Sequence, residues 1–245
     1  MKTSGNTIFI TGGGSGIGRA LAHRWHDQGN KVIIAGRRRA ALDEAIGDRA
    51  NMLGVELDIE DAADIGHVAA QLIADHPDLN IVVNNAGIMR SEALGAPRDL
   101  ADAAATILTN LLGPIRVIDA LVDHLAQTPD AAIVTVSSGL AFVPLVSAPT
   151  YSATKAAIHS YSLSLREQLR GKVEVIELVP PGVQTDLTPG QATRDGYMPL
   201  DAYIDEVMGL FAQTPTPTEI CVERVGFLRR AEAEGRFDAT LATLN

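Results

Sequence analysis

Short apolar runs alternate with longer amphipathic stretches through most of the chain. The apolar runs are rich in Val and Ile and have the length of strands that are buried on both faces of a parallel sheet. Six runs are therefore predicted as strands: 8–10, 32–35, 52–57, 81–83, 133–136 and 173–179. Five stretches carry Ala, Leu, Glu, Arg and Gln at helical spacing: 16–28, 38–47, 61–75, 98–126 and 151–170. This alternation predicts a doubly wound α/β sheet with helices on both faces and ligands beyond the carboxyl ends of the strands.

The periodicity weakens after the last predicted strand, where Pro180-Pro181-Gly182 follows. The stretch 186–199 contains Thr, Pro, Gly and Asp without a helical repeat, so we expect a loop or a short helix there. Two further helices are predicted at 201–212 and 218–234, separated by two prolines that end a helix. We therefore assign a single domain to 1–245, with a substrate-loop region at 186–217 and a C-terminal helical extension at 218–245.

The formal net charge of −10 disfavours a nucleic-acid or anionic-membrane partner, because either would be repelled. Cys221 is the only cysteine, so no disulfide and no zinc site of cysteine and histidine ligands is expected, and we predict no metal. The N-terminal sequence lacks the basic segment and longer apolar core of a signal peptide, and no apolar stretch approaches the roughly 18 residues that span a bilayer. We expect a cytoplasmic protein.

Tyr151 and Lys155 stand four residues apart in a predicted helix, so the phenol and the ammonium lie on one helical face. A neighbouring cation favours the charged form of a tyrosine, so we expect Lys155 to lower the pKa of Tyr151 from about 10. Ser138 ends a predicted strand thirteen residues before the tyrosine, with Ser137 as its competitor. This group predicts acid–base chemistry on an oxygen-bearing substrate.

A glycine-rich turn with Gly12, Gly16 and Gly18 follows the first predicted strand and opens the first predicted helix. Missing side chains allow the backbone to approach a pyrophosphate at the positive end of a helix. At the end of the second strand, where an enzyme that selects NAD usually carries an acidic residue, the chain has Arg37 and Arg38. Guanidinium groups bind phosphate through paired hydrogen bonds, so we expect NADP(H), with NAD(H) as the weaker alternative.

Asn110 is a poor residue for a helix interior, and Pro114 follows it four positions later. Because proline has no N–H, the Asn110 carbonyl lacks its usual partner, so a kink is predicted there. The freed carbonyl can bind water, or the kink can serve packing alone.

These residues, in this order and with Asn84-Asn85-Ala86-Gly87, make the chain resemble the short-chain dehydrogenase/reductase family, and loosely a bacterial subgroup associated with teichoic-acid D-alanylation. The resemblance implies a Rossmann-like fold. It implies four catalytic residues: Ser138 for the substrate oxygen, Tyr151 as proton donor, Lys155 beside the tyrosine and the nicotinamide ribose, and Asn110 for a relay water. It also implies cofactor contacts from Gly12, Gly14, Ser15, Gly16, Ile17, Gly18, Arg37, Arg38, Asp58, Ile59, Asn85, Ala86, Gly87, Tyr151, Lys155, Pro181, Gly182, Val183 and Thr185.

Within that set the resemblance implies that Asp58 meets the adenine and Thr185 the nicotinamide carboxamide or the phosphates. It also implies that the turn 84–87 passes beside the adenosine ribose, although Asn84 is equally suited to tie neighbouring strands together. The family usually ends in an apolar strand and an Asp-Gly-Gly sequence, which this chain lacks. We therefore expect six strands, with seven as the open alternative, and a homodimer through 98–126 and 151–170, with a homotetramer as its alternative.

The resemblance implies an NADPH-dependent carbonyl reductase or alcohol dehydrogenase acting on a small-molecule carbonyl or alcohol. Expected pocket residues are mostly apolar, which suggests a small-to-medium apolar ketone or aldehyde: 140–145, Met89, Leu187, Tyr197 and Met198. Arg90 is suited to a substrate carboxylate or to an exposed surface position. An NAD-dependent alcohol dehydrogenase and a non-catalytic NADP-binding sensor remain as alternatives.

Overall fold

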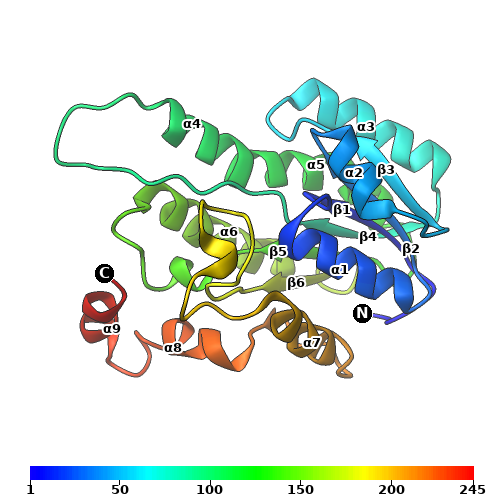
Figure 1. Cartoon of the computed structure of the whole chain (residues 1–245). Coiled ribbons are helices and arrows are strands. Elements are labelled where there is room, and N and C mark those ends of the chain that lie inside the picture. Colours follow the sequence, from blue (N-terminus) through cyan, green and yellow to red (C-terminus); the bar gives the residue numbers. More distant parts are fainter.

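Seven parallel strands form one sheet in the order β3-β2-β1-β4-β5-β6-β7 (Figure 1). The computed structural model describes all 245 residues. The strands are β1 Thr7–Thr11, β2 Lys31–Gly36, β3 Met52–Glu56, β4 Leu79–Asn84, β5 Ala132–Val136, β6 Glu174–Leu178 and β7 Glu219–Ile220. The helices are α1 Gly16–Asp27, α2 Arg39–Ile46, α3 Ala62–Asp75, α4 Ala101–Ile107, α5 Gly113–Leu125, α6 Pro149–Gln168, α7 Leu200–Phe211, α8 Gly226–Arg229 and α9 Phe237–Leu244.

The strands are buried on both faces because alternate apolar residues enter two separate core clusters. Ile8 and Ile10 of β1 pack with residues of α1, α2 and α7 on one face, where Trp25 and Phe211 meet edge to face with ring centroids 5.4 Å apart. Phe9 of β1 packs with residues of α3, α5 and α6 on the other face. The expected doubly wound architecture is confirmed, and the strand order reverses between β1 and β4, where such sheets bind ligands.

The continuous helical stretch Ala101–Leu125 is long and apolar enough to cross a membrane by length and composition alone. In the fold, its residues Val117, Leu121 and Leu125 are buried in the core cluster shared with α3. Its hydropathy is therefore accounted for by packing against the sheet and a neighbouring helix.

The C-terminal region corrects one sequence prediction. A helix at 218–234 was expected, but within that stretch Glu219–Ile220 forms β7, followed by a 3-10 turn at Glu223–Val225 and the short helix α8. The register pairs Glu177 with Glu219 and Leu178 with Ile220, which adds a seventh strand to the six predicted. The two-residue strand was missed because a pattern of period two cannot be recognised over so short a run.

Candidate functional site

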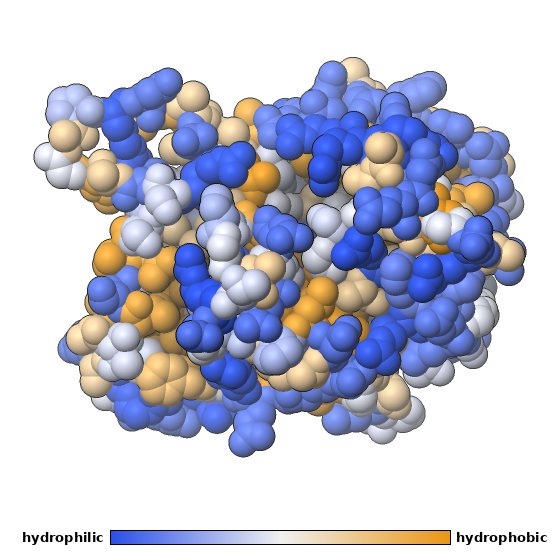
Figure 2. Space-filling view, in the orientation of Figure 1, coloured by the Kyte–Doolittle hydropathy of each residue, from blue (hydrophilic) through white to orange (hydrophobic).

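A groove crosses the carboxyl edge of the sheet, where the loops after β1, β2, β4, β5 and β6 meet. It consists of two adjoining hollows of about 210 and 510 Å³ that share Gly12, Ser15, Arg37, Arg38 and the segment after β4. The space-filling view shows this face hollowed near its centre, with hydrophobic side chains at the bottom and hydrophilic ones around the rim (Figure 2). The position is the one predicted for a ligand of a doubly wound sheet.

The glycine turn lies against the segment that follows β4. Gly12 has a φ of +68°, and a Cβ there would lie 2.8 Å from the Ala86 Cα, so only glycine allows this approach. The side-chain amide of Asn85 donates to the carbonyls of Thr11 and Gly12 at 3.0 and 3.1 Å. The Thr11 hydroxyl accepts from the backbone N–H groups of Asn85 and Ala86 at 3.1 Å each. These bonds fix the floor of the groove.

Asn85, rather than Asn84, supplies the tie between segments that was one alternative for Asn84. Both polar side-chain atoms of Asn84 are buried without a hydrogen-bond partner. Gly18 does not line the groove; a Cβ there would lie 2.4 Å from the Asn85 amide nitrogen and from the Gly12 carbonyl oxygen. Gly18 therefore permits helix α1 to pack closely on the turn.

The N-terminus of α1 opens into the groove. Ser15 is the N-cap residue, and its side chain makes no capping hydrogen bond, so it does not compete for the amides of the first helical turn. Ser15, Gly16 and Ile17 line one hollow, and Gly14 lines the other. Unpaired N–H groups and the helix dipole make this end suited to a phosphate.

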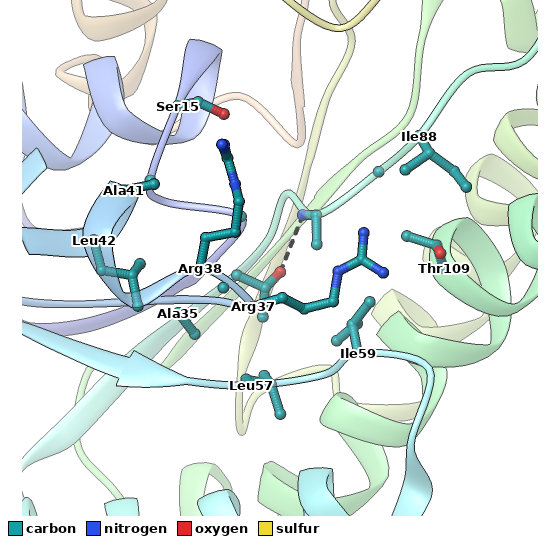
Figure 3. Close-up of a pocket in the computed structure, with 16 residues that line it drawn as sticks. Ser15, Ala35, Arg37, Arg38, Ala41, Leu42, Leu57, Ile59, Ile88 and Thr109 are labelled. Carbon is teal, nitrogen blue, oxygen red and sulfur yellow. Dashed lines mark hydrogen bonds between the residues drawn. The ribbon is translucent and has the colours of Figure 1, made fainter. Parts of the chain in front are cut away.

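Arg37 and Arg38 border the groove where β2 ends. Figure 3 shows Arg38 extending toward Ser15, and Arg37 extending toward Thr109 beside Ile59. The Arg37 guanidinium lies 3.9 Å from Glu60, with 60% of its side chain exposed. The two cations therefore flank the hollow beyond β2, and together with the uncapped α1 terminus they fit a dinucleotide that carries an additional phosphate.

Arg39 differs from its two neighbours. Its guanidinium donates to the Gly54 carbonyl at 3.0 Å and pairs with Asp43 at 2.8 Å, away from the groove. Asp58, expected to meet the adenine, is exposed and accepts a hydrogen bond from the Glu60 amide at 3.1 Å, and it does not line the groove. Its neighbours Leu57 and Ile59 do line it.

Ser138, Tyr151 and Lys155 lie together at the other end of the groove. Each is nearly buried, with 7%, 8% and 4% exposed. The Ser138 hydroxyl lies beside the Tyr151 phenol and tends to lower its pKa, whereas Ser137 is buried with an unpartnered hydroxyl. Lys155 Nζ donates to the Val136 carbonyl at 2.8 Å and lies 5.5 Å from the centroid of the Tyr151 ring.

The electrostatics of this group reverse one expectation. Burial raises the pKa of Tyr151 to about 12, and Lys155 is not among the groups that lower it. Burial also lowers the pKa of Lys155 to about 8. The pKa of Tyr151 is therefore raised instead of lowered, because burial removes the charged phenolate from water. The phenol stays protonated at neutral pH.

Asn110 lies below the groove rather than in its lining. The irregularity predicted there takes the form of a π-helical turn, Leu108–Leu112, ahead of Pro114. The Asn110 side chain is 1% exposed and is hydrogen-bonded to the backbone of Ile88. A Cβ added to Gly87 would lie 3.4 Å from Asn110 Oδ1 and 3.8 Å from Lys155 Nζ, which places the asparagine close to the lysine.

The segment after β6 forms the remaining wall, through Pro181, Val183 and Thr185. Gly182 faces away, where a Cβ would lie 3.1 Å from the Tyr197 ring. Gln191 also lines the groove; its amide donates to the Val183 carbonyl at 2.8 Å and to the Thr185 hydroxyl at 3.1 Å. No sequence pattern indicated Gln191, since it lies in the stretch without periodicity.

The walls around the catalytic group are more polar than expected. Of the apolar residues predicted there, only Leu187 lines the groove, and it is joined by Arg90, Asp186 and Gln191. Arg90 has 49% of its side chain exposed and lies 3.7 Å from Asp102.

Comparison with known proteins was consistent with this geometry. A family model described as short chain dehydrogenase matches residues 6–195. The chain is 40% identical over 235 residues to the uncharacterized oxidoreductase DltE of Bacillus subtilis (strain 168), covering 94% of this chain and 93% of that protein. It is 30% identical to the NADP-dependent 3-hydroxy acid dehydrogenase YdfG of Salmonella typhi over 179 residues, covering 72% and 71%.

Among solved structures, a short chain dehydrogenase from Burkholderia cenocepacia J2315, in complex with NADP, aligns with a TM-score of 0.84 at 24% identity. The alignment covers 100% of this chain and 99% of that one. At this identity the likeness concerns the fold alone.

Proposed function

Because the chain belongs to the short-chain dehydrogenase/reductase family, we propose that it is an NADP-dependent oxidoreductase that interconverts a carbonyl group and an alcohol. The observation that carries the proposal is the burial of Ser138, Tyr151 and Lys155 in one hollow that continues to Arg37 and Arg38. A proton donor and a phosphate-binding end share one groove, as a reaction between a dinucleotide and a small molecule requires.

The bound nicotinamide supplies the hydride for reduction or accepts it in oxidation. Ser138 donates a hydrogen bond to the substrate oxygen and fixes its position. Tyr151 transfers its proton to that oxygen as negative charge develops there, for which its raised pKa keeps it in the protonated form. Lys155, held by the Val136 carbonyl, provides a positive charge beside the phenol that favours the phenolate left after transfer.

Tyr151→Phe is the variant that tests this function. It removes only the hydroxyl, so we expect NADPH binding to persist while carbonyl reduction falls by about 10²–10⁴-fold, the range for loss of a general acid. The measurement is turnover of a carbonyl panel with NADPH and NADH, with NADPH binding followed by fluorescence. Undiminished turnover of the variant would remove Tyr151 from the mechanism. Binding without turnover in the wild type on every carbonyl and alcohol would favour the alternative of a sensor.

Arg90 in the wall of the groove favours a substrate with a negatively charged group over the apolar ketone expected from the sequence. Two cationic side chains line the catalytic end of the groove, Lys155 and Arg90. The guanidinium of Arg90 can bind a carboxylate through paired hydrogen bonds. The relative named for 3-hydroxy acids supports the same choice. Arg90→Gln should raise KM for an oxo or hydroxy acid by about 10-fold or more and leave KM for an uncharged ketone unchanged; equal effects on both would contradict it.

We also propose a homodimer in the cytoplasm. The exposed side chains Leu94 and Ile107 border an apolar hollow with Leu111 and Ala153 on the α4 and α6 side, which is the face expected from the sequence. Light scattering at several protein concentrations tests the dimer, and a monomer at all of them would contradict it.

A further inference from the structure

A second group of titratable side chains lies away from the groove, where α6 crosses the edge of the sheet. Glu177 of β6 and Glu219 of β7 are register partners on adjacent parallel strands, so their side chains share one face of the sheet. His159 of α6 reaches them from above the sheet. Two carboxylates directly opposite each other repel, so this arrangement requires compensating positive charge.

Glu177 is the least compensated member of the group. Its side chain is fully buried, Oε2 pairs with His159 Nδ1 at 2.8 Å, and Oε1 has no hydrogen-bond partner. A buried carboxylate oxygen without a partner is costly, since nothing replaces its lost hydration. The free oxygen belongs to the carboxylate at the centre of the group and is the observation that points to a missing ligand.

The distances suit a metal ion. One ligand atom from each of His159, Glu177 and Glu219 can be chosen so that all three lie within 4.8 Å of one another. Around a tetrahedral ion with bonds of about 2.1 Å, ligand atoms are about 3.4 Å apart. Small side-chain rotations would close the set, and three protein ligands leave a fourth position for water.

The surroundings hold the ligands in place. Arg229 donates to both oxygens of Glu219, at 2.7 and 3.0 Å, which fixes that carboxylate. The Phe142 ring packs edge to face on His159 with centroids 4.7 Å apart, and the Arg229 guanidinium lies over the same Phe142 ring, 4.4 Å from its centroid. Arg166, which donates to the carbonyls of Val175 and Thr218, is the second guanidinium near Glu219. Both guanidiniums act on Glu219, whereas Glu177 Oε1 keeps no partner.

We propose that His159, Glu177 and Glu219 form a binding site for a divalent transition-metal ion, for which Zn²⁺ is the probe. One imidazole and two carboxylates suit Zn²⁺, whereas Mg²⁺ prefers oxygen ligands alone in octahedral geometry. The ion would tie α6, which carries Tyr151 and Lys155, to the last two strands. The sequence-based expectation of no metal considered only cysteine and histidine as ligands and left these carboxylates out.

The test measures Zn²⁺ binding to the full chain after chelator treatment and dialysis, by calorimetry and by thermal unfolding. We expect one ion per chain, and at 100-fold excess of Zn²⁺ over Kd a rise of about 5–10 °C in the unfolding temperature. Mg²⁺ should give no rise. Glu177→Gln should weaken binding by more than about 10-fold, and Glu44→Gln, the same change at an exposed position, should not.

Circular dichroism establishes that the Glu177→Gln chain is folded, and His159→Asn serves as a second variant if it is not. Absence of saturable Zn²⁺ binding to the wild type would overturn the site, as would equal binding by wild type and both variants, which would indicate an ordinary histidine–glutamate pair only. The readouts do not involve hydride transfer, so the outcome is separate from that of the proposed function.

Discussion

The Asn110 side chain is hydrogen-bonded to both backbone groups of Ile88: Oδ1 accepts from the Ile88 N–H at 2.8 Å, and Nδ2 donates to the Ile88 carbonyl at 2.8 Å. These two hydrogen bonds join the π-helical turn Leu108–Leu112 to the segment after β4. Since Gly87 lies next to Ile88 and close to Lys155, the asparagine fixes one wall of the groove.

Asn110→Leu should lower the free energy of unfolding by about 2 kcal/mol, because both backbone groups of Ile88 lose their partner. Asn110→Asp keeps the acceptor for the Ile88 N–H but turns a second acceptor toward its carbonyl, so it should also destabilise. Urea unfolding measures both changes. A loss below about 0.5 kcal/mol for the leucine variant, the level of an ordinary surface change, would show that Ile88 is held by other contacts.

Arg37→Ser and Arg38→Ser should weaken NADPH binding by about 10–100-fold each, the value of a hydrogen bond to a charged group, and leave NADH binding nearly unchanged. Arg39→Ser is the matched control, because Arg39 is bonded to Gly54 and Asp43 instead of lining the groove. The measurement is the dissociation constant of each variant for NADPH and for NADH. Equal weakening of NADPH and NADH would mean that the arginines do not select the additional phosphate.

Lys155→Met should stabilise the fold at pH 7 while abolishing activity. The pKa of Lys155 falls from 10.5 to about 8 in the folded chain, so its charged form is disfavoured there by about 3 kcal/mol. Loss of the hydrogen bond to Val136 offsets about 1 kcal/mol of that, which leaves a gain of about 2 kcal/mol.

The pH dependence of this gain follows from the sign of the shift. Between pH 8 and 10.5 the unfolded wild type binds more protons than the folded one, so wild-type stability rises with pH in that window. The advantage of Lys155→Met should therefore narrow as the pH rises above about 8. Unfolding free energies of both proteins from pH 6 to about 9.5 measure it, and a gap that is constant with pH would contradict the buried-charge explanation.

Gly12 and Gly5 both have a positive φ, +68° and +71°, but only Gly12 has neighbouring atoms where a Cβ would be added. Comparing Gly12→Ala with Gly5→Ala therefore separates the cost of backbone strain from the cost of steric overlap. Gly5 has no atoms within 4 Å of an added Cβ, so its replacement should cost about 1 kcal/mol of unfolding free energy. Gly12→Ala should cost about 3 kcal/mol, since the new methyl group also meets Ala86. Similar losses for the two variants would mean that the turn relaxes away from Ala86.

The sequence was sufficient to predict the six long strands, the helices up to 170 and the place of the groove, because these depend on local periodicity and on the rule for the edge of a doubly wound sheet. The predicted helix 38–47 began one residue early, because Arg38 precedes α2 as its N-cap residue. The contact of Asp58 with the adenine was assigned from the resemblance alone and stays a prediction: its side chain is exposed between Leu57 and Ile59, which line the groove.

The features that the sequence did not reveal all depend on tertiary contacts. The pKa of Tyr151 is set by burial that arises only when α6 packs below the groove. Gln191 binds residues that a loop without a repeat brings to it. His159, Glu177 and Glu219 become neighbours only through the pairing of β6 with β7, which no local pattern indicates.

The shortness of β7 has a consequence for assembly. A strand of two residues offers almost no free N–H and C=O groups along its outer side, so another chain cannot readily extend the sheet at that border. Copies of this protein that associate near β7 must therefore do so through side chains of the surrounding helices, which makes such contacts adjustable by single substitutions and guards the molecule against fibre-like stacking from that side.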